Sequence, residues 1–212
     1  MKKAIIFDLD GTLWDSADAV VAGFNEVLRG VPEFSLQLSK EDVRGLLGKL
    51  LVDITRDLLP KNLSDGRIAE LNTALCEGDV AYLARCGAPL YPFVRETLCK
   101  LKEDYALYIV SNCQKNYIET FLEFHRLQDL FCGHLCAGDT GKPKADNIRT
   151  VIEKYGIDRA LYIGDTDGDF RAATAAGMPF LHAAYGYGKP HIPTPSVSAF
   201  EELPRAVKEY LG

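Results

Sequence analysis

The sequence predicts an α/β fold, in which a parallel sheet of about five strands is flanked by helices and a small all-helical unit is inserted after the first strand. Three observations support this. Short, fully apolar runs of strand length recur, which is typical of parallel strands covered on both faces. After about residue 92, these runs alternate with helical spacing of apolar residues. Between the first run and residue 90, the spacing is helical throughout.

The first expected strand, residues 4–7 (AIIF), stops abruptly at Asp8. Open α/β sheets bind ligands at the carboxyl ends of their strands, so Asp8 stands where chemistry is expected. Asp10 follows two residues later, and a strand-like backbone would point both carboxylates to one side. Gly11 then permits a turn with positive φ. An Asp-Gly pair also suits a hairpin, but helical spacing follows instead of a second alternating strand.

The helical unit is expected over residues 15–91, which leaves residues 1–14 and 92–212 for the catalytic core. Ser39 with Asp42 can form a capping box at the start of one helix. Ser64 can cap another, which would stop at Gly87. Such an insertion implies a small separate unit that is joined to the core by two passages of the chain.

Two glycines, Gly45 and Gly48, interrupt the helical pattern of the insertion, and each weakens a helix by about 1 kcal/mol relative to Ala. One interpretation is a break that presents Arg44 or Lys49 toward the core and its substrate. The other is close helix packing at the glycines, with both basic side chains in solvent. The residues favour neither.

Polar residues also follow the later expected strands, which cover residues 105–110, 134–137, 160–163 and 178–182. Ser111 and Asn112 end the second strand, where a hydroxyl and backbone amides suit a phosphate oxygen, although Ser111 could simply cap the next helix. Asp165 and Asp169 follow the fourth strand. A polar loop over residues 138–144 holds Lys142 and Lys144, just before a helix expected from about Ala145.

Composition excludes several classes of function. Apolar residues make up 47% and charged residues 25%, as in ordinary globular proteins, and the net charge of −6 gives no general attraction to nucleic acid or to an anionic membrane. No apolar run is long enough for a membrane span, and no secretion signal is visible, so a cytoplasmic location is expected. The six cysteines lie within apolar patterns without a C-x-x-C pair, so reduced thiols are expected.

The stretch DLDGT at residues 8–12, the serine after the second strand, the lysine before a helix and the GDTDGD stretch at residues 164–169 together resemble the haloacid dehalogenase-like (HAD) superfamily, in particular its phosphoglycolate phosphatase-like branch with a helical cap. The resemblance implies a Rossmann-like sheet. It also implies catalytic roles for four residues: Asp8 as nucleophile, Asp10 as general acid and base, and Ser111 and Lys144 as phosphate-binding groups.

The resemblance further implies Mg²⁺, since four gathered carboxylates need a cation and Mg²⁺ prefers oxygen ligands. The implied metal site comprises Asp8, Asp10 through its backbone carbonyl, and Asp165, with Asp169 supporting it. Asn112 is expected to help bind the substrate. Lys142 remains an alternative to Lys144 because it matches a Lys-Pro variant of the family motif, and Lys49 is a further candidate from the cap.

The expected function is a Mg²⁺-dependent phosphomonoester hydrolase acting on a small phosphorylated metabolite through an aspartyl phosphate. One alternative is a sugar phosphomutase of the same superfamily, which also keeps both aspartates. The alternative from another class is a non-catalytic module that binds a phosphorylated ligand. The sequence leaves open whether the protein is a monomer or a homodimer.

Overall fold

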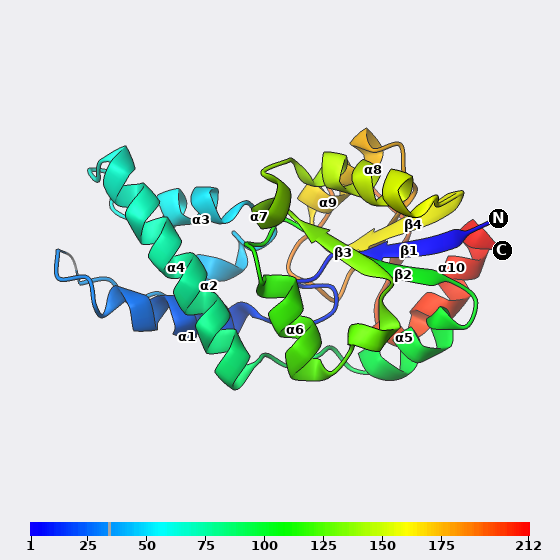
Figure 1. Cartoon of the computed structure of the whole chain (residues 1–212), viewed down its shortest axis with the longest axis horizontal. Coiled ribbons are helices and arrows are strands. Elements are labelled where there is room, and N and C mark those ends of the chain that lie inside the picture. The colour runs from blue at the N-terminus through cyan, green and yellow to red at the C-terminus, as the bar shows by residue number, and fades with distance from the viewer. Residues whose placement is uncertain (34) are drawn as a thin grey trace.

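The computed structural model describes residues 1–33 and 35–212, and its centre is a parallel sheet of six strands in the order β3-β2-β1-β4-β5-β6 (Figure 1). The predicted α/β fold is therefore confirmed, and β1 lies near the middle of the sheet. The strands are β1 (Lys3–Phe7), β2 (Ala106–Ser111), β3 (Gly133–Cys136), β4 (Arg159–Gly164), β5 (Phe180–Ala183) and β6 (Ser196–Val197).

The structure corrects the predicted elements in two places. The two-residue strand β6 was not predicted, because so short a segment has no apolar run to mark it. Residues 137–140 form a short helix, α7 (Ala137–Thr140), where the last residue of the third strand and the start of a polar loop were expected. That helix ends at Gly141, whose φ of 66° provides the left-handed conformation common after a helix.

Alternate side chains of the strands form two separate cores, one on each face of the sheet. Ile5 and Phe7 face helices α5 (Val94–Lys102), α6 (Tyr117–His125) and α10 (Leu203–Leu211), whereas Ala4 and Ile6 face α8 (Lys144–Tyr155) and α9 (Asp167–Ala175). Figure 1 shows these groups of helices on opposite sides of the sheet. Two 3₁₀ turns, Gln128–Leu130 and Phe200–Glu202, complete the connections. Double coverage explains why the central strands are continuous apolar runs.

The helices between β1 and residue 90 gather at one end of the molecule, on the left of Figure 1. They are α1 (Ala17–Leu28), α2 (Lys40–Arg44), α3 (Leu51–Leu58) and α4 (Asp65–Cys86). Their apolar faces share a cluster of their own, which includes Val20, Phe24, Leu71 and Leu75. The chain enters and leaves this helical insertion side by side, since Trp14 forms a bridge with Leu90.

The helical insertion breaks at its glycine-rich segment. Ser39 and Asp42 form the predicted capping box of α2, yet that helix ends before Gly45. Gly48 has a φ of 91°, and α3 begins only at Leu51. A side chain at Gly48 would be strained at that φ, which accounts for glycine there.

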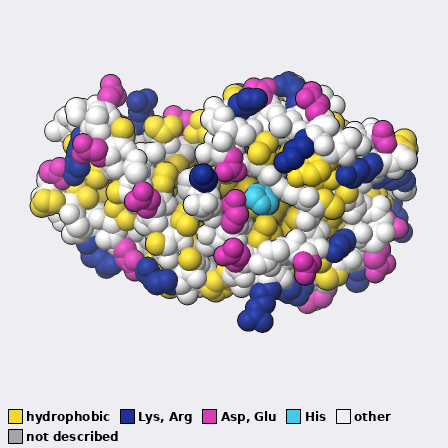
Figure 2. Space-filling view, viewed as in Figure 1, with side chains coloured by type: hydrophobic (Ala, Val, Ile, Leu, Met, Phe, Trp, Pro, Cys, Tyr) yellow, Lys and Arg dark blue, Asp and Glu magenta, His cyan; other side chains and the backbone are white. Residues whose placement is uncertain are grey.

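The surface carries charges of both signs (Figure 2), and the cysteines form no disulfide. In the view of Figure 2, acidic and basic side chains are interspersed over both ends of the molecule. All six cysteines are free, although Cys86, Cys99 and Cys132 are exposed, contrary to their expected place in apolar patterns. Across residues 1–33 and 35–212, no helix combines the length and apolar character that a bilayer crossing needs.

Candidate active site

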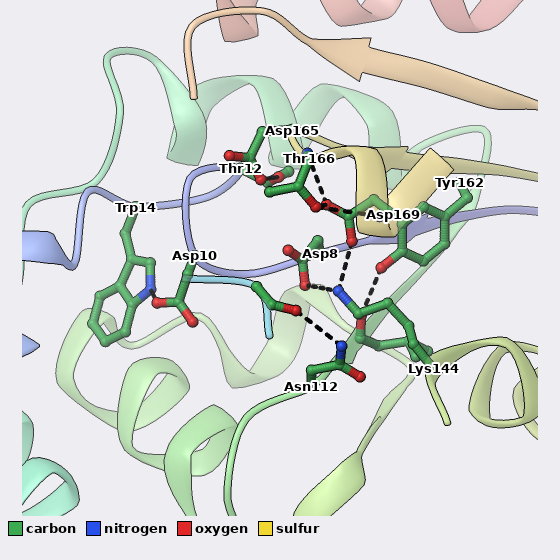
Figure 3. Close-up of polar contacts among 12 residues, drawn as sticks. Asp8, Asp10, Thr12, Trp14, Asn112, Lys144, Tyr162, Asp165, Thr166 and Asp169 are labelled. Atoms are coloured by element: carbon green, nitrogen blue, oxygen red, sulfur yellow. Dashed lines mark hydrogen bonds and ion pairs between the residues drawn. The ribbon is translucent and has the colours of Figure 1, made fainter. Parts of the chain in front are cut away.

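Three carboxylates meet where β1 and β4 end. Asp8 follows β1 directly, Asp165 follows β4, and Asp169 lies in the first turn of α9. Each offers an oxygen such that these three atoms lie within 4.8 Å of one another, and all three side chains are buried. Because β1 and β4 are adjacent parallel strands with Phe7 paired to Ile163, their carboxyl ends share one edge of the sheet (Figure 3). We refer to Asp8, Asp165 and Asp169 as the acidic triad.

Lys144, the first residue of α8, reaches into the acidic triad. Its Nζ lies 2.9 Å from Asp8 Oδ1 and 2.6 Å from Asp169 Oδ1, and its side chain is 4% exposed. Burial opposes its charge, but Asp169 and Asp8 outweigh this and raise the pKa of Lys144 well above its usual range. The ammonium group therefore stays charged and offsets part of the negative charge.

One ammonium does not balance the acidic triad. Burial, with repulsion from Asp169, raises the pKa of Asp8 to about 7, despite Lys144. Burial, with repulsion from Asp169 and Asp8, raises the pKa of Asp165 well above its usual range. Asp8 Oδ2 is buried without a hydrogen-bond partner. A missing partner of positive charge fits these observations, and an all-oxygen set of carboxylates suits Mg²⁺.

The loop after β1 approaches Asp165 closely. Gly11 has a φ of 77°, and a Cβ built there would lie 2.2 Å from Asp165 Oδ2. Glycine is therefore required both by the backbone and by the space. Asp165 Oδ2 accepts from the backbone amide of Tyr187 at 2.7 Å, and Thr12 Oγ1 donates to Oδ1 at 3.4 Å.

The side chain of Asp10 is held apart from the acidic triad and points toward Trp14 (Figure 3). Its Oδ1 accepts three hydrogen bonds, from Trp14 Nε1 at 2.9 Å, from Tyr117 Oη at 2.8 Å and from Ser16 Oγ. Burial raises the pKa of Asp10, while these three donors lower it. Ser16 and Tyr117 could not be found from the sequence, because neither belongs to a motif that points to Asp10, and Tyr117 reaches it from a distant helix, α6.

Ser111 and Asn112 lie beside Asp10, because β2 is the neighbour of β1 on its other side. Ser111 is buried at the end of β2, but the following helix, α6, begins only at Tyr117. The alternative that Ser111 caps the next helix is therefore wrong, because the N-cap of α6 is Asn116. Asn112 Nδ2 donates to Gly48 O in the helical insertion at 2.9 Å, while its Oδ1 is buried without a partner.

A cavity of about 30 Å³ separates the insertion from the core. The core contributes Asp10, Ser111 and Asn112, and the insertion contributes apolar side chains, Lys49 and Asp79. The sequence analysis missed Asp79, although a signal exists: on α4, Leu71, Leu75, Asp79 and Leu83 recur every four residues and all are buried. An aspartate in that series occupies an apolar position.

The structure separates the two lysine alternatives. Lys144 contacts the acidic triad, whereas Lys142 is exposed, although both residues line a larger outer pocket of about 590 Å³. Lys49 lines the inner cavity, but its ammonium pairs with Asp57 at 2.9 Å and its side chain is 48% exposed. Of these three cations, only Lys144 lies within hydrogen-bond distance of the acidic triad.

Comparison with known proteins agrees with this geometry. The sequence model of the haloacid dehalogenase-like hydrolases matches residues 5–183. A phosphoglycolate phosphatase of Rhodobacter capsulatus is 33% identical, over 98% of this chain and 92% of its own length. One from Aliivibrio fischeri is 29% identical, over 87% and 85%. A crystal structure of a predicted phosphoglycolate phosphatase from Haemophilus somnus superimposes with a TM-score of 0.85 at 23% identity, covering 97% of this chain and 98% of that one.

Proposed function

Because the chain belongs to the haloacid dehalogenase-like hydrolase family, we propose that it is a Mg²⁺-dependent phosphatase that hydrolyses a small phosphorylated metabolite through an aspartyl phosphate. The observation that carries the proposal is the buried acidic triad with Lys144 inside it and an unpartnered oxygen on Asp8. A phosphate ester is an anion, so it can approach Asp8 only where positive charge is concentrated.

The residues fit a divalent cation. Asp8 and Asp165 would hold the ion with the backbone carbonyl of Asp10, while Asp169 would support the site through Lys144 and Thr166. When bound, Mg²⁺ supplies positive charge that stabilises the phosphoryl oxygens. Asp169 accepts from Thr166 Oγ1 at 2.6 Å and thereby holds both a helix start and an edge of the acidic triad in place.

In the proposed first step, an oxygen of Asp8 attacks phosphorus and the bond to the leaving alcohol breaks. Asp10 gives its proton to the leaving oxygen. All three donors to Asp10 bind Oδ1, which leaves Oδ2 for that proton. In the second step, Asp10 takes a proton from water, the water oxygen attacks phosphorus, and Asp8 is released with inorganic phosphate. Lys144 and Ser111 bind phosphoryl oxygens, with Asn112 in support.

Residues 15–91 are proposed as a cap on a core formed by residues 1–14 and 92–212. The cap has its own apolar cluster, and the cavity beneath it, at about 30 Å³, has room for only one or two water molecules. Substrate entry would therefore require the cap to lift, which breaks the contact between Asn112 and Gly48. Closure would then exclude water during the first step. A cytoplasmic location completes the proposal, supported by the six free thiols.

The experiment is a measurement of phosphate release from a panel of small phosphomonoesters, including phosphoglycolate, with Mg²⁺ and with a chelator. We expect release with Mg²⁺ only, and a loss of at least about a thousandfold in Asp8→Asn, since an amide is a poor nucleophile. An isomerised sugar phosphate without free phosphate would point to a mutase. Binding of phosphate esters without turnover would point to a binding module.

A further inference from the structure

Asp79 is a buried acid that the proposed reaction does not use. It lies on α4 in the cap, is 2% exposed, and lines the same cavity as Asp10 and Ser111. Because Asp10 would protonate the leaving alcohol, the rest of that alcohol would lie near Asp79 once the cap has lifted to make room for it.

The two oxygens of Asp79 have different environments. Oδ2 accepts a hydrogen bond from Gln114 Nε2 in the core at 2.8 Å, whereas Oδ1 is buried without a partner. Behind it, α1 passes closely, since a Cβ at Gly23 would lie 3.5 Å from Oδ1. Buried polar atoms in native proteins are nearly always paired, so an unpaired oxygen on a residue that lines the cavity indicates a missing ligand group.

The charges around the cavity restrict that group. The charged side chains that line it, among the described residues, are Asp10, Asp79 and Lys49. Lys49 is already paired with Asp57 at 2.9 Å. A carboxylate on the leaving alcohol would therefore be buried beside two acids with no uncommitted cation to compensate the loss of its hydration, which is costly whether or not those acids are ionised.

A hydroxyl group suits Asp79 in both of its protonation states. It can donate to an ionised Oδ1, and it can accept from a protonated one. This versatility matters because burial raises the pKa of Asp79 to about 8, so both forms are populated near neutral pH. The amide of Gln114 would hold the acid in one orientation.

We propose that Asp79, oriented by Gln114, forms a leaving-group subsite that selects phosphate esters of polyols over phosphate esters whose alcohol carries a carboxylate. This inference rests on the proposed function and specifies its substrate class. It separates this chain from relatives that carry the name phosphoglycolate phosphatase. The alternative role of the hydrogen bond between Asp79 and Gln114 is that of a latch, a contact that only joins the cap to the core.

The experiment compares kcat/KM for glycerol phosphate and phosphoglycolate, with Mg²⁺, in the full chain. We expect the wild type to prefer glycerol phosphate by about tenfold or more, as expected for a site that hydrogen-bonds a hydroxyl. Asp79→Leu should lose about tenfold to a hundredfold on glycerol phosphate with little change on phosphoglycolate. Asp79→Asn keeps the shape but cannot ionise, so it should raise kcat/KM for phosphoglycolate most at and above pH 8, where wild-type Asp79 is largely charged.

Glu77→Gln is the matched control, because Glu77 is an exposed acid two residues earlier on the same helix. It should leave the ratio of the two substrates unchanged. If both Asp79 variants change the two substrates by equal factors, the pair is a latch and the inference is wrong. A wild-type preference for phosphoglycolate would also overturn it. Absence of phosphate release from either ester and from the wider panel would instead contradict the proposed function.

Discussion

Lys144 places one ammonium group between two buried carboxylates, Asp8 and Asp169. Removing one partner from a buried ion pair exposes the remaining charges to one another without compensation. In the proposed reaction, the same ammonium also binds a phosphoryl oxygen. Lys144 is therefore central to both the electrostatics of the acidic triad and the approach of substrate.

Lys144→Met should lower kcat/KM for phosphate release by about a hundredfold to a thousandfold, as for loss of one preorganised donor to a transition state. Lys142→Ala is the comparison, because Lys142 lies two residues away and is exposed. It should lose far less. Steady-state phosphate release measures both variants, and a greater loss for Lys142→Ala would reverse the assignment.

Asp79 gives a prediction about pH and stability. Burial raises its pKa to about 8 in the folded protein, above the value near 3.9 of an unfolded chain. At a pH between these two pKa values, Asp79 keeps its proton in the folded state but has lost it in the unfolded state. The contribution of this proton to the free energy of unfolding is therefore full below the lower pKa and falls as pH rises toward 8. Asp79→Asn has no such proton, so its stability relative to wild type should increase from pH 5 to pH 8.

Urea unfolding of both proteins at the two pH values measures this difference. Comparison with wild type cancels the contributions of the other titrating groups that the substitution leaves alone. An Asp79→Asn effect that is equal at pH 5 and pH 8 would contradict the raised pKa.

At the start of α9, one residue both caps the helix and contributes a carboxylate to the acidic triad. Thr166 and Asp169 form a capping box: Thr166 Oγ1 accepts from the amide of Asp169 at 3.2 Å, and Asp169 Oδ2 accepts from the amide of Thr166 at 3.0 Å. The other oxygen of Asp169 binds Lys144. One local motif therefore stabilises the helix and orients a member of the acidic triad.

Thr166→Ala should cost about 1 kcal/mol of stability through the lost cap. It should also weaken Mg²⁺ binding by about tenfold, since residues that orient metal-site carboxylates affect affinity. Ser39→Ala removes the equivalent cap from the exposed box of α2 in the helical insertion. That control should lose stability without a change in Mg²⁺ affinity, measured by calorimetric titration. Equal Mg²⁺ affinity in wild type and Thr166→Ala would contradict the coupling.

Elements with strong local signals could be predicted from the sequence. Strands β1, β2 and β4 are covered on both faces, which requires continuous apolar runs. Such runs mark a strand clearly in the sequence and leave only its exact ends to be determined. Helix α7 lacked such a signal because its sequence, AGDT, is short and polar. The start of α6 also lacked a signal, since Asn116 adopts a left-handed conformation, with φ of 68°, directly ahead of the helix. Such a conformation is rare for a residue other than glycine.

Some residues of the site could be inferred from the sequence, and others required the fold. Asp8, Asp165 and Lys144 follow or begin elements of recognisable pattern, so their meeting at one sheet edge could be inferred from parallel topology. The partners of Asp10 come from distant positions, such as Tyr117 on α6, and depend on how helices pack. Asp79 required the fold as well, because burial of an acid in a helix is decided by what covers that face.

For the whole molecule, the acidic triad predicts that Mg²⁺ stabilises the fold, since a ligand that binds only the folded state raises its stability. Mg²⁺ should raise the thermal unfolding midpoint of the wild type. Asp165→Asn should abolish that shift and raise the midpoint of the metal-free protein, because it removes one of the repelling buried charges. Asp167→Asn is the control, as Asp167 pairs with Arg171 outside the acidic triad. An equal loss of the Mg²⁺ shift in both variants would argue against the metal site.

The central claim is that the fold brings distant residues together so that Asp8 becomes a phosphoryl acceptor beside a bound cation. Rapid acid quenching during turnover with Mg²⁺, followed by mass spectrometry of the peptides, tests it most directly. We predict one phosphoryl group on the peptide that contains β1 and Asp8. The group should be localised to Asp8 and absent in Asp8→Asn. Turnover with the phosphoryl group on another residue, or undiminished turnover in Asp8→Asn, would contradict the account.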